Sequence, residues 1–338
     1  MSMMTRLCKA IPQVWYFILL WLAPFTVHAL NCSATIGNVN FGGVNVLSVA
    51  NPLATQTAPI TVECTTAILE AGGNVTACIW LGGGSGGYDT SSRFLSGSMR
   101  YDLYKDSAYS QIWGWTGAPL GNGPESFVFN VSDGLLGIGG YGSTSGTLYA
   151  AVSPNQSTLS VGSYSSSFST PSQSLLKWAR GTNVSCSSMS NTDPINSFSV
   201  TASIAANCLI ATNDLNFGTT SSLASNVDAS TTLSVTCTNA TSYSVGLSNG
   251  DHYSSGRRMR LGSSGNNYIN YELYTDLGHK NVWSNSCTTL PGSSANCANG
   301  TGTGSSQQPP ITVYGQVPAQ SITAAGTYTD TIIATITF

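Results

Sequence analysis

The chain of 338 residues carries one sequence pattern twice, in the same order. Each copy has a cysteine, an Asn-Phe-Gly run, a second cysteine, a Tyr-x-Leu-Tyr run before a tryptophan, and a Gly-x-Tyr run. The matched segments of the first and second copies are 31–42 and 207–218, 61–64 and 234–237, 100–113 and 270–283, 148–152 and 313–317, and 162–164 and 326–328. Chance does not order so many matches, so we expect two copies of one β-domain.

The composition indicates the class of both copies. Charged residues make up only 7% of the chain, against roughly a quarter in a typical soluble domain. Short β-branched and aromatic runs alternate with clusters of Gly, Asn and Ser, which is typical of strands and turns. About seven such strands per copy predict an all-β protein of two immunoglobulin-like β-sandwich domains. The net charge of −3, without a basic stripe, argues against a nucleic-acid partner.

Residues 1–29 have the pattern of a secretory signal peptide. Arg6 and Lys9 precede an apolar run, and the segment ends in Val27-His28-Ala29, which resembles a cleavage site. The apolar run is too short to span a membrane comfortably. We therefore expect an exported protein with an N-terminal domain at 30–204 and a C-terminal domain at 205–338. Residues 195–204 would be a closing strand and linker of the N-terminal domain.

Beyond residue 29 the chain has eight cysteines, four in each copy. They are Cys32, Cys64, Cys78, Cys186, Cys208, Cys237, Cys287 and Cys297. An even number in an exported protein suggests disulfides. The simplest pairing is Cys32–Cys64 and Cys208–Cys237, which leaves Cys78–Cys186 and Cys287–Cys297; four cysteines nevertheless allow three pairings in each domain. Zinc would need CxxC pairs or Cys/His clusters, so we predict no metal.

The two copies differ at their C-terminal ends. The second copy ends on an alternating strand, whose apolar residues are Tyr328, Ile332, Ala334, Ile336 and Phe338. The first copy continues past the equivalent point, through a Ser-rich insertion, to another alternating run at 198–204. We therefore expect the second sandwich to lack one strand that the first possesses. Such a domain exposes an apolar groove and unpaired backbone groups, which a strand from another chain can fill.

These residues resemble the spore coat protein U domain family, whose domain is used by archaic (Csu-type) chaperone–usher pili. The resemblance rests on the early cysteine, the Asn-Phe-Gly run, the Tyr-x-Leu-Tyr-x-Asp run and the terminal Gly-x-Tyr-x-Asp-x-Ile run. It implies that the second domain is an incomplete, donor-strand-accepting pilin fold. A periplasmic chaperone would lend the missing strand, and the N-terminal extension of the adjacent pilin subunit would later replace it. Phe338 would place its carboxylate where the chaperone anchors it.

The N-terminus then indicates the position of such a subunit in a fibre. A donor segment needs roughly ten residues, and only Leu30 and Asn31 precede Cys32 after the predicted cleavage. We therefore expect a subunit that accepts a strand without donating one, exported through the periplasm and an outer-membrane usher to the pilus tip on the cell surface. Two domains of this kind resemble the family's two-domain tip adhesins.

Two loops of the first copy are candidates for the binding surface. Both contain apolar residues flanked by Gly or Pro, as in exposed turns, and have no equivalent in the second copy. The candidates are Trp115, Leu120, Leu135, Leu136, Ile138 and Tyr141. Trp113, which has its counterpart in Trp283, is instead expected in the core, and residues 66–73 are a weaker candidate loop. The resemblance implies hydrophobic finger-like loops that attach to abiotic or host surfaces and start biofilms.

Three other functions fit parts of the sequence. A glycan-binding lectin would use Trp115, Tyr141 and neighbouring Asn residues, and a structural coat protein would have no adhesive role. A secreted hydrolase would rest on the G-x-S-x-G match at 83–87, but that match lies in a Gly/Ser tract and no amphipathic helix follows. The G-x-G-x-x-G match at 137–142 lacks the acidic residue of a dinucleotide site. We predict no catalytic residue and no cofactor.

Overall fold

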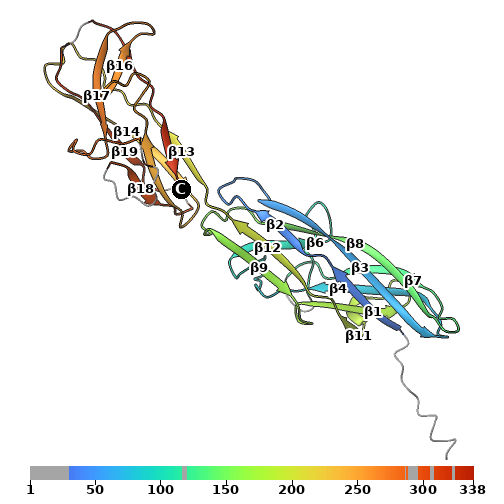
Figure 1. The fold of residues 1–338 in the computed structure, drawn as a ribbon. Helices are drawn as coiled ribbons and strands as arrows, with labels where there is room; N and C mark the ends of the chain where they lie inside the picture. The colour runs from blue at the N-terminus through green and yellow to red at the C-terminus, as the bar shows by residue number, and fades with distance from the viewer. Residues whose placement is uncertain (1–29, 116–119, 286, 288–295, 305–307, 322–323) are drawn as a thin grey trace, which may run out of the picture.

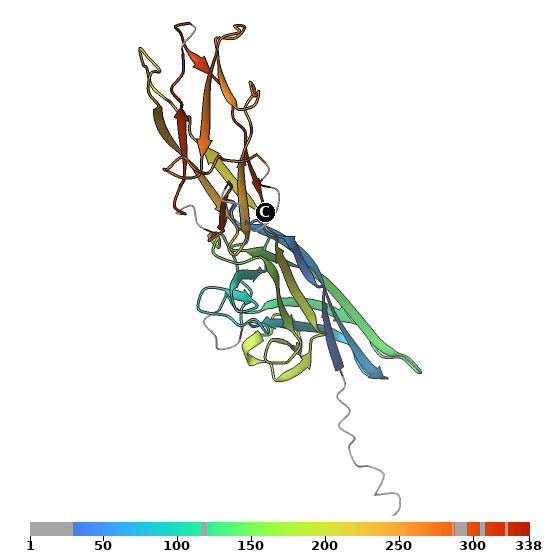
Figure 2. The ribbon, with the colours of Figure 1, turned by 60° about the vertical axis from the view of Figure 1, so that its left-hand side comes forward.

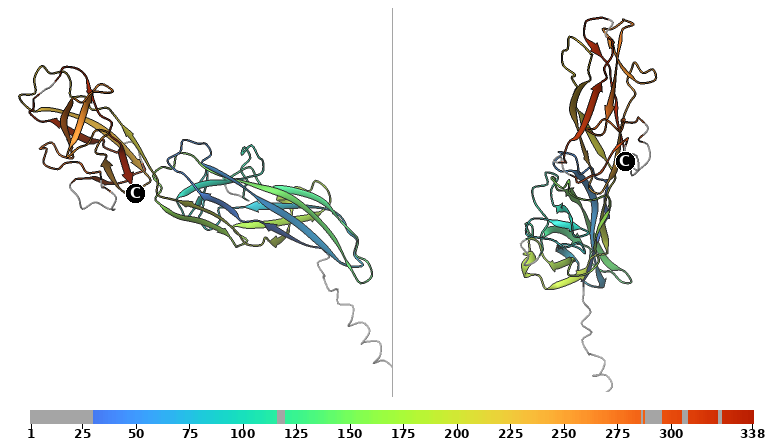
Figure 3. Two further views of the ribbon diagram at one scale, coloured as in Figure 1. Left: turned by 45° about the horizontal axis from the view of Figure 1, so that its top comes forward. Right: turned by 90° about the vertical axis from the view of Figure 1, so that its left-hand side faces the viewer.

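The computed structural model describes residues 30–115, 120–285, 287, 296–304, 308–321 and 324–338. Two elongated β-domains lie end to end and are joined by a short segment after residue 204 (Figures 1 and 3). In the described part of the chain, the one helical element is a short 3-10 turn, η1 (Cys186–Ser188). The predicted signal peptide, residues 1–29, lies outside the described residues.

The first domain consists of two long sheets and a third, shorter one. Its strands are β1 (Leu30–Ile36), β2 (Val39–Gly43), β3 (Ala54–Ile68), β4 (Gly73–Leu81), β5 (Arg93–Leu95), β6 (Met99–Tyr104), β7 (Glu125–Val131), β8 (Gly139–Val152), β9 (Gly162–Phe168), β10 (Ser174–Arg180), β11 (Asn191–Pro194) and β12 (Phe198–Ile204). The strand orders are β1-β3-β8-β6-β5, β11-β10-β4-β7 and β2-β12-β9. Side chains alternate between core and solvent along β1 and β12, as expected for half-buried strands.

The second domain repeats this topology with fewer strands. Its strands are β13 (Cys208–Thr212), β14 (Val227–Cys237), β15 (Ser242–Leu247), β16 (Arg257–Leu261), β17 (Tyr268–Tyr274), β18 (Ala298–Thr301), β19 (Ile311–Val317), β20 (Tyr328–Thr329) and β21 (Ala334–Thr337). They form sheets of order β13-β14-β19-β17-β16-β20 and β18-β15-β21. The predicted all-β fold of two sandwich domains is therefore confirmed.

The closing strand β12 marks the main difference between the two domains. β12 lies between β2, with which it pairs in parallel, and β9, with which it pairs antiparallel. Its inward side chains, Phe198, Val200, Ala202 and Ile204, are all buried in the core. In the second domain, β20 corresponds to β9 and residues 215–218 correspond to β2. Within the described residues no strand lies between those two segments.

Four disulfides hold the two domains, and they are the pairs that the cysteine spacing favoured. They join Cys32 to Cys64, Cys78 to Cys186, Cys208 to Cys237 and Cys287 to Cys297. The first and third link directly opposed residues of neighbouring strands, β1 with β3 and β13 with β14. The same staple therefore recurs at the same place in each sandwich.

A buried arginine organises the middle of each sandwich. Arg93 is fully buried and donates to the carbonyls of Gly82, Leu81 and Trp113, at 2.6–2.7 Å, and to the carboxylate of Asp102 at 3.2 Å. Burial raises the pKa of Asp102 to about 6, although the charge of Arg93 opposes that shift. In the second domain, Arg257 makes the corresponding contacts with Ser248, Leu247, Trp283 and Glu272.

The arginine also positions the repeated tryptophan. Trp113 and Trp283 are both buried, as expected, and each indole N–H donates to a strand carbonyl, that of Ile79 in the first domain and Val245 in the second. The two networks superimpose residue for residue, so the repeat preserves a polar core centre as well as apolar packing.

Substituting Arg93 with Met tests the importance of this network. The variant leaves three buried carbonyls and the Asp102 carboxylate without their donor, so we expect the free energy of unfolding to fall by roughly 3–5 kcal/mol. Urea denaturation followed by fluorescence gives the value. Arg100→Met, which removes a half-exposed guanidinium paired with Asp89, is the matched control and should change stability by less than about 1 kcal/mol. Equal losses in the two variants would contradict the assigned role of Arg93.

Candidate surface-binding tip and strand-acceptor groove

Two connections between the facing sheets form the end of the first domain that is remote from the second (Figures 1 and 3). One connects β3 to β4 and the other connects β7 to β8. Six large apolar side chains here are exposed, with Leu136 the most exposed at 83%. We call these six the tip cluster: Ile68, Leu69, Leu135, Leu136, Ile138 and Tyr141. Four of them are predicted surface-binding residues, and Ile68 and Leu69 lie in the loop that the sequence marked as a weaker candidate.

The turn geometry directs these side chains outward. Leu135 and Ile138 exchange backbone hydrogen bonds of 2.8 and 3.1 Å, so Leu136 and Gly137 form a two-residue turn. Gly137 has φ +87°, which glycine adopts without steric cost. Leu69 adopts φ +62°, a conformation that is uncommon for a large residue, and it is 67% exposed. Leu69 thus presents an exposed apolar side chain from a backbone conformation of raised energy.

Hydrogen bonds join the β3–β4 connection to the β7–β8 connection. The Gly134 amide donates to the Glu70 carbonyl at 2.7 Å, and the Gly72 amide donates to the Asp133 carboxylate at 2.7 Å. A Cβ on Gly134 would lie 2.1 Å from the Ala67 carbonyl, so only glycine permits this approach. The tip cluster therefore lies on one joined support and not on two independent loops.

Arg180, at the end of β10, supports this tip from a third segment. Its guanidinium donates to the carbonyls of Ala71 and Gly72, at 2.7 and 2.8 Å, and pairs with the Glu70 carboxylate at 3.1 Å. The following loop is anchored by the Cys78–Cys186 disulfide. The end of β10 thus provides a strut that reaches the β3–β4 connection.

Two predicted surface-binding residues lie elsewhere. Leu120 is only 1% exposed, so its assignment to an exposed loop is wrong, and Trp115 is half-buried. Their loop folds back on itself, with the Trp115 amide donating to the Leu120 carbonyl at 3.4 Å. It adjoins Leu81 at the far end of β4, whereas the tip adjoins Gly73 at the near end, roughly 25 Å away at the usual rise per residue. Residues 116–119 of this loop lie outside the described residues.

The equivalent connections of the second domain contact the first domain. The Asn239 side chain donates to the Thr158 carbonyl at 2.8 Å and to the Ser160 hydroxyl at 3.0 Å. A Cβ on Gly304 would lie 1.7 Å from the Ser157 carbonyl. The position that forms a polar, close-fitting joint in the second domain therefore carries the tip cluster in the first.

The second candidate site is the unfilled edge of the second domain, seen from another side in Figure 2. Its predicted groove residues Tyr328, Ile332, Ala334 and Ile336 are only partly buried, although they pack on the core. The strand pairing shows which residue of the first domain corresponds to Phe338. Ile79 and Val245 occupy equivalent positions, because each accepts the hydrogen bond of the repeated tryptophan. Ile79 pairs with Leu176 and Val245 pairs with Ile336, so Phe338, two residues further on, corresponds to Trp178. Trp178 is 8% exposed beneath β11, whereas Phe338 is 44% exposed. The groove thus corresponds to the place of β11 and β12.

Asp330 is a polar group within this groove. Its carboxylate accepts from the Tyr271 hydroxyl at 2.7 Å and from the Asp251 amide at 3.0 Å. Burial, and then the hydrogen bond to Asp330, raises the pKa of Tyr271, so this hydroxyl stays protonated and donates. The corresponding residue of the first domain is Ser166, which is fully buried and accepts from the Gly86 amide at 3.0 Å.

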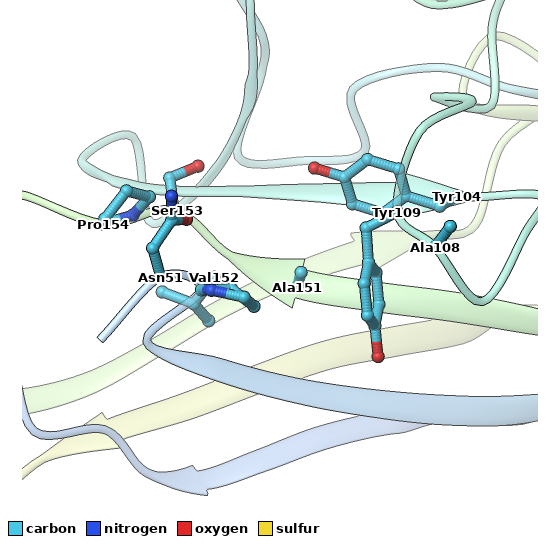
Figure 4. A pocket seen from close by; sticks show the side chains of 9 residues that line it. Asn51, Tyr104, Ala108, Tyr109, Ala151, Val152, Ser153 and Pro154 are labelled. Carbon is cyan, nitrogen blue, oxygen red and sulfur yellow. The ribbon is translucent and has the colours of Figure 1, made fainter.

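A shallow pocket of about 300 Å³ opens at the other end of the first domain (Figure 4). Tyr104 and Tyr109 lie on one side of it, and Asn51, Ser153 and Pro154 on the other (Figure 4). The tyrosine rings pack edge to face at 5.5 Å, and Tyr274 with His279 repeats this pair at 4.9 Å in the second domain. The aromatic side of the pocket is therefore a feature of the repeated fold.

Among the described residues, no group of three or more His, Cys, Asp or Glu side chains is placed to hold a metal ion. No helix in the described part of the chain is long and apolar enough to cross a membrane.

Comparison with known proteins identifies the family. The model of the Spore Coat Protein U domain matches residues 22–170 and again 195–335, one match for each copy of the repeat. The chain belongs to the spore coat protein U domain family. Protein U of Myxococcus xanthus is 35% identical over 138 residues, which are 37% of this chain and 71% of that protein.

One solved structure shares the fold of this family member at low sequence identity. One chain of the chaperone–tip adhesion subunit pre-assembly complex from archaic chaperone–usher Csu pili of Acinetobacter baumannii matches with a TM-score of 0.50 and 15% identity. The match covers 92% of this chain and all of that chain. The CupB6 tip adhesin of Pseudomonas aeruginosa matches with a TM-score of 0.34 and 12% identity, and the match covers 91% of this chain and 94% of that chain.

Removing the strut tests how the tip is supported. In Arg180→Met, we expect faster amide hydrogen exchange at residues 68–73, because the turn loses two backbone contacts and an ion pair. The melting temperature should fall by only a few degrees, since the guanidinium is partly exposed. Arg180→Lys, which restores the charge without the fork of donors, should give intermediate exchange. Unchanged exchange in both variants would show that the turn is rigid without Arg180.

Proposed function

We propose that this protein is a pilus tip adhesin that attaches to nonpolar surfaces through the tip cluster. The observation that carries the proposal is the gathering of six exposed apolar side chains on two joined connections, β3–β4 and β7–β8, at the free end of the molecule. A soluble domain rarely exposes contiguous apolar side chains in this way without a partner. Attachment through this end would contribute to the formation of biofilms.

The physics of the tip cluster suits a partner without defined shape. Burial of apolar area contributes roughly 25 cal/mol per Å² and needs no directional contact. Leu136 lies in a two-residue turn, the shortest common connection of a hairpin, and Leu135 and Ile138 flank it, so all three would be presented together to a flat surface. An abiotic or host surface with exposed apolar groups would therefore be the natural partner.

The groove gives the second half of the proposal. The second domain would accept a strand, first from a periplasmic pilus chaperone and then from the adjacent pilin subunit, after passage through an outer-membrane usher. The first domain of the same chain supports this part of the proposal, because its strand β12 fills the same position and is buried along its whole inner face. The chain would be exported under the direction of residues 1–29, with the domains divided near residue 205, and would be displayed at the pilus tip.

Two alternatives receive less support. A tip lectin using Trp115 and Tyr141 would need them in one site, and they lie at opposite ends of β4 and its neighbours. The pocket between Tyr104 and Asn51 lies toward the second domain, away from the tip cluster (Figures 1 and 4). A structural coat protein without adhesive role would not need the exposed tip cluster. The proposal assigns no reaction and no cofactor to the chain.

Three serine substitutions at the tip test adhesion. In the variant Leu135→Ser, Leu136→Ser and Ile138→Ser, we expect retention on polystyrene to fall at least about tenfold, since each buried apolar side chain contributes roughly 1.5–3 kcal/mol. The melting temperature should change by less than about 2 °C, because exposed substitutions are nearly neutral.

The matched control replaces exposed apolar residues away from the tip. Val49→Ser with Leu277→Ser removes side chains that are 100% and 73% exposed, and retention should stay at the level of the unaltered protein. An equal loss of retention in the control would show nonspecific hydrophobic adsorption and would contradict the assignment of adhesion to the tip cluster. Retention that free sugars abolish, and that survives the three tip substitutions, would favour the lectin.

A further inference from the structure

The first domain contains its own example of a strand seated in the groove. β12 runs antiparallel to β9, and its inward residues Phe198, Val200, Ala202 and Ile204 oppose Phe168, Ser166, Tyr164 and Gly162. The repeat aligns these last four with Ile332, Asp330, Tyr328 and Gly326 of the second domain. Tyr and Gly are unchanged, and Phe168 becomes another large apolar residue. Only Ser166 changes its chemistry, to a carboxylate at Asp330.

We propose that the strand accepted by the second domain carries a hydrogen-bond-donating side chain, such as Thr, Ser or Asn, at the position opposite Asp330. This inference rests on the proposed acceptor role of the groove. It specifies one position of the incoming strand, which the first domain fills with Val200 opposite Ser166. The other inward positions would keep the pattern of β12, with a small residue opposite Tyr328 and large apolar residues at both ends.

A strand seated in the groove would exclude water from Asp330. Val200 and Ser166 are both 0% exposed, so a seated strand removes this position from water entirely. In the open groove, Asp330 is still partly exposed, and its carboxylate accepts hydrogen bonds from the Tyr271 hydroxyl and the Asp251 amide. A carboxylate offers about four acceptor sites, so water must supply the rest until the strand arrives.

A hydroxyl on the strand replaces that lost water. Directly opposed residues of an antiparallel pair have Cβ atoms roughly 4.5–5.5 Å apart, which places a short hydroxyl side chain within reach of the carboxylate. Hydrogen bonds to an ionised acceptor are about twice as strong as neutral ones, and a buried charge without partners is costly. Val at this position would bury the carboxylate of Asp330 without donating a hydrogen bond to it. In the first domain, Ser166 is uncharged, so Val200 buries no charge there.

A double-mutant cycle in the full chain tests the proposal. Residues 191–204 are appended after Phe338 through a Gly/Ser linker that reproduces the spacing between Trp178 and Asn191 in the first domain. The grafted copy carries either the natural Val at position 200 or Val200→Thr, which is nearly isosteric. Each graft is made with the natural Asp330 and with Asp330→Ser, and the melting temperature of the second domain is measured for the four proteins and for the chain without a graft.

We expect the Val200→Thr graft to melt about 4 °C above the Val graft when Asp330 is present. The Asp330→Ser substitution restores the combination of Val and Ser found in the first domain. With that substitution, the Val graft should melt at the same temperature as the Thr graft or higher. A Val graft equal to or better than the Thr graft beside Asp330 would overturn the proposal, and so would a Thr advantage that persists with Asp330→Ser. If no graft raises the melting temperature, the acceptor role of the groove fails, and this inference fails with it.

Discussion

The last strand of an immunoglobulin-like sandwich must satisfy two requirements at once, because it covers the apolar core and pairs the backbone groups of its neighbours. In the first domain, β12 meets both, with buried alternate side chains and backbone pairing to β2 and β9. In the described part of the second domain, the same neighbours have no strand between them. The remaining core residues there, including Ile332 and Ile336, stay partly exposed. The first domain thus closes its own sandwich and the described part of the second does not. The other features of the molecule can be understood from this difference between two copies of one fold.

The two ends of each domain also have divided roles. The connections at the end of the second domain that faces the first are polar and fit closely against it, through Asn239 and Gly304. The same connections of the first domain have no neighbour among the described residues and carry the tip cluster. The same end of the fold is therefore docked in the second domain and free in the first. Arg180, at the end of β10, and the Cys78–Cys186 disulfide support the free end.

Much of this architecture was predictable from the sequence, because duplication leaves a local record. The repeated cysteines predicted the disulfides, and the unequal continuation past residue 168 predicted the missing strand. The exposure of Leu135, Leu136 and Ile138 followed from apolar residues beside Gly in a segment without a counterpart. Family membership was predicted from the same motifs and is shown by the match to both copies.

Other features depend on tertiary contacts that leave no local signal. Leu120 and Trp115 also stand beside Gly and Pro, yet their loop folds inward because its backbone bonds to itself and to β4. Arg93 and Arg257 would be expected at the surface, since arginine rarely lies in a core without partners. Their partners are mostly backbone carbonyls, to which every residue type contributes equally, so no sequence pattern reveals them. Arg180 was missed for the same reason.

The most direct measurement concerns the unfilled edge of the second domain. The full chain would be exported to a bacterial periplasm with and without a chaperone of the archaic chaperone–usher type, and soluble yield and co-purification would be assayed. The account predicts that soluble protein depends on the chaperone and purifies with it as a one-to-one complex. A stable, soluble monomer without the chaperone would show that the second domain closes its own fold, and would contradict the account.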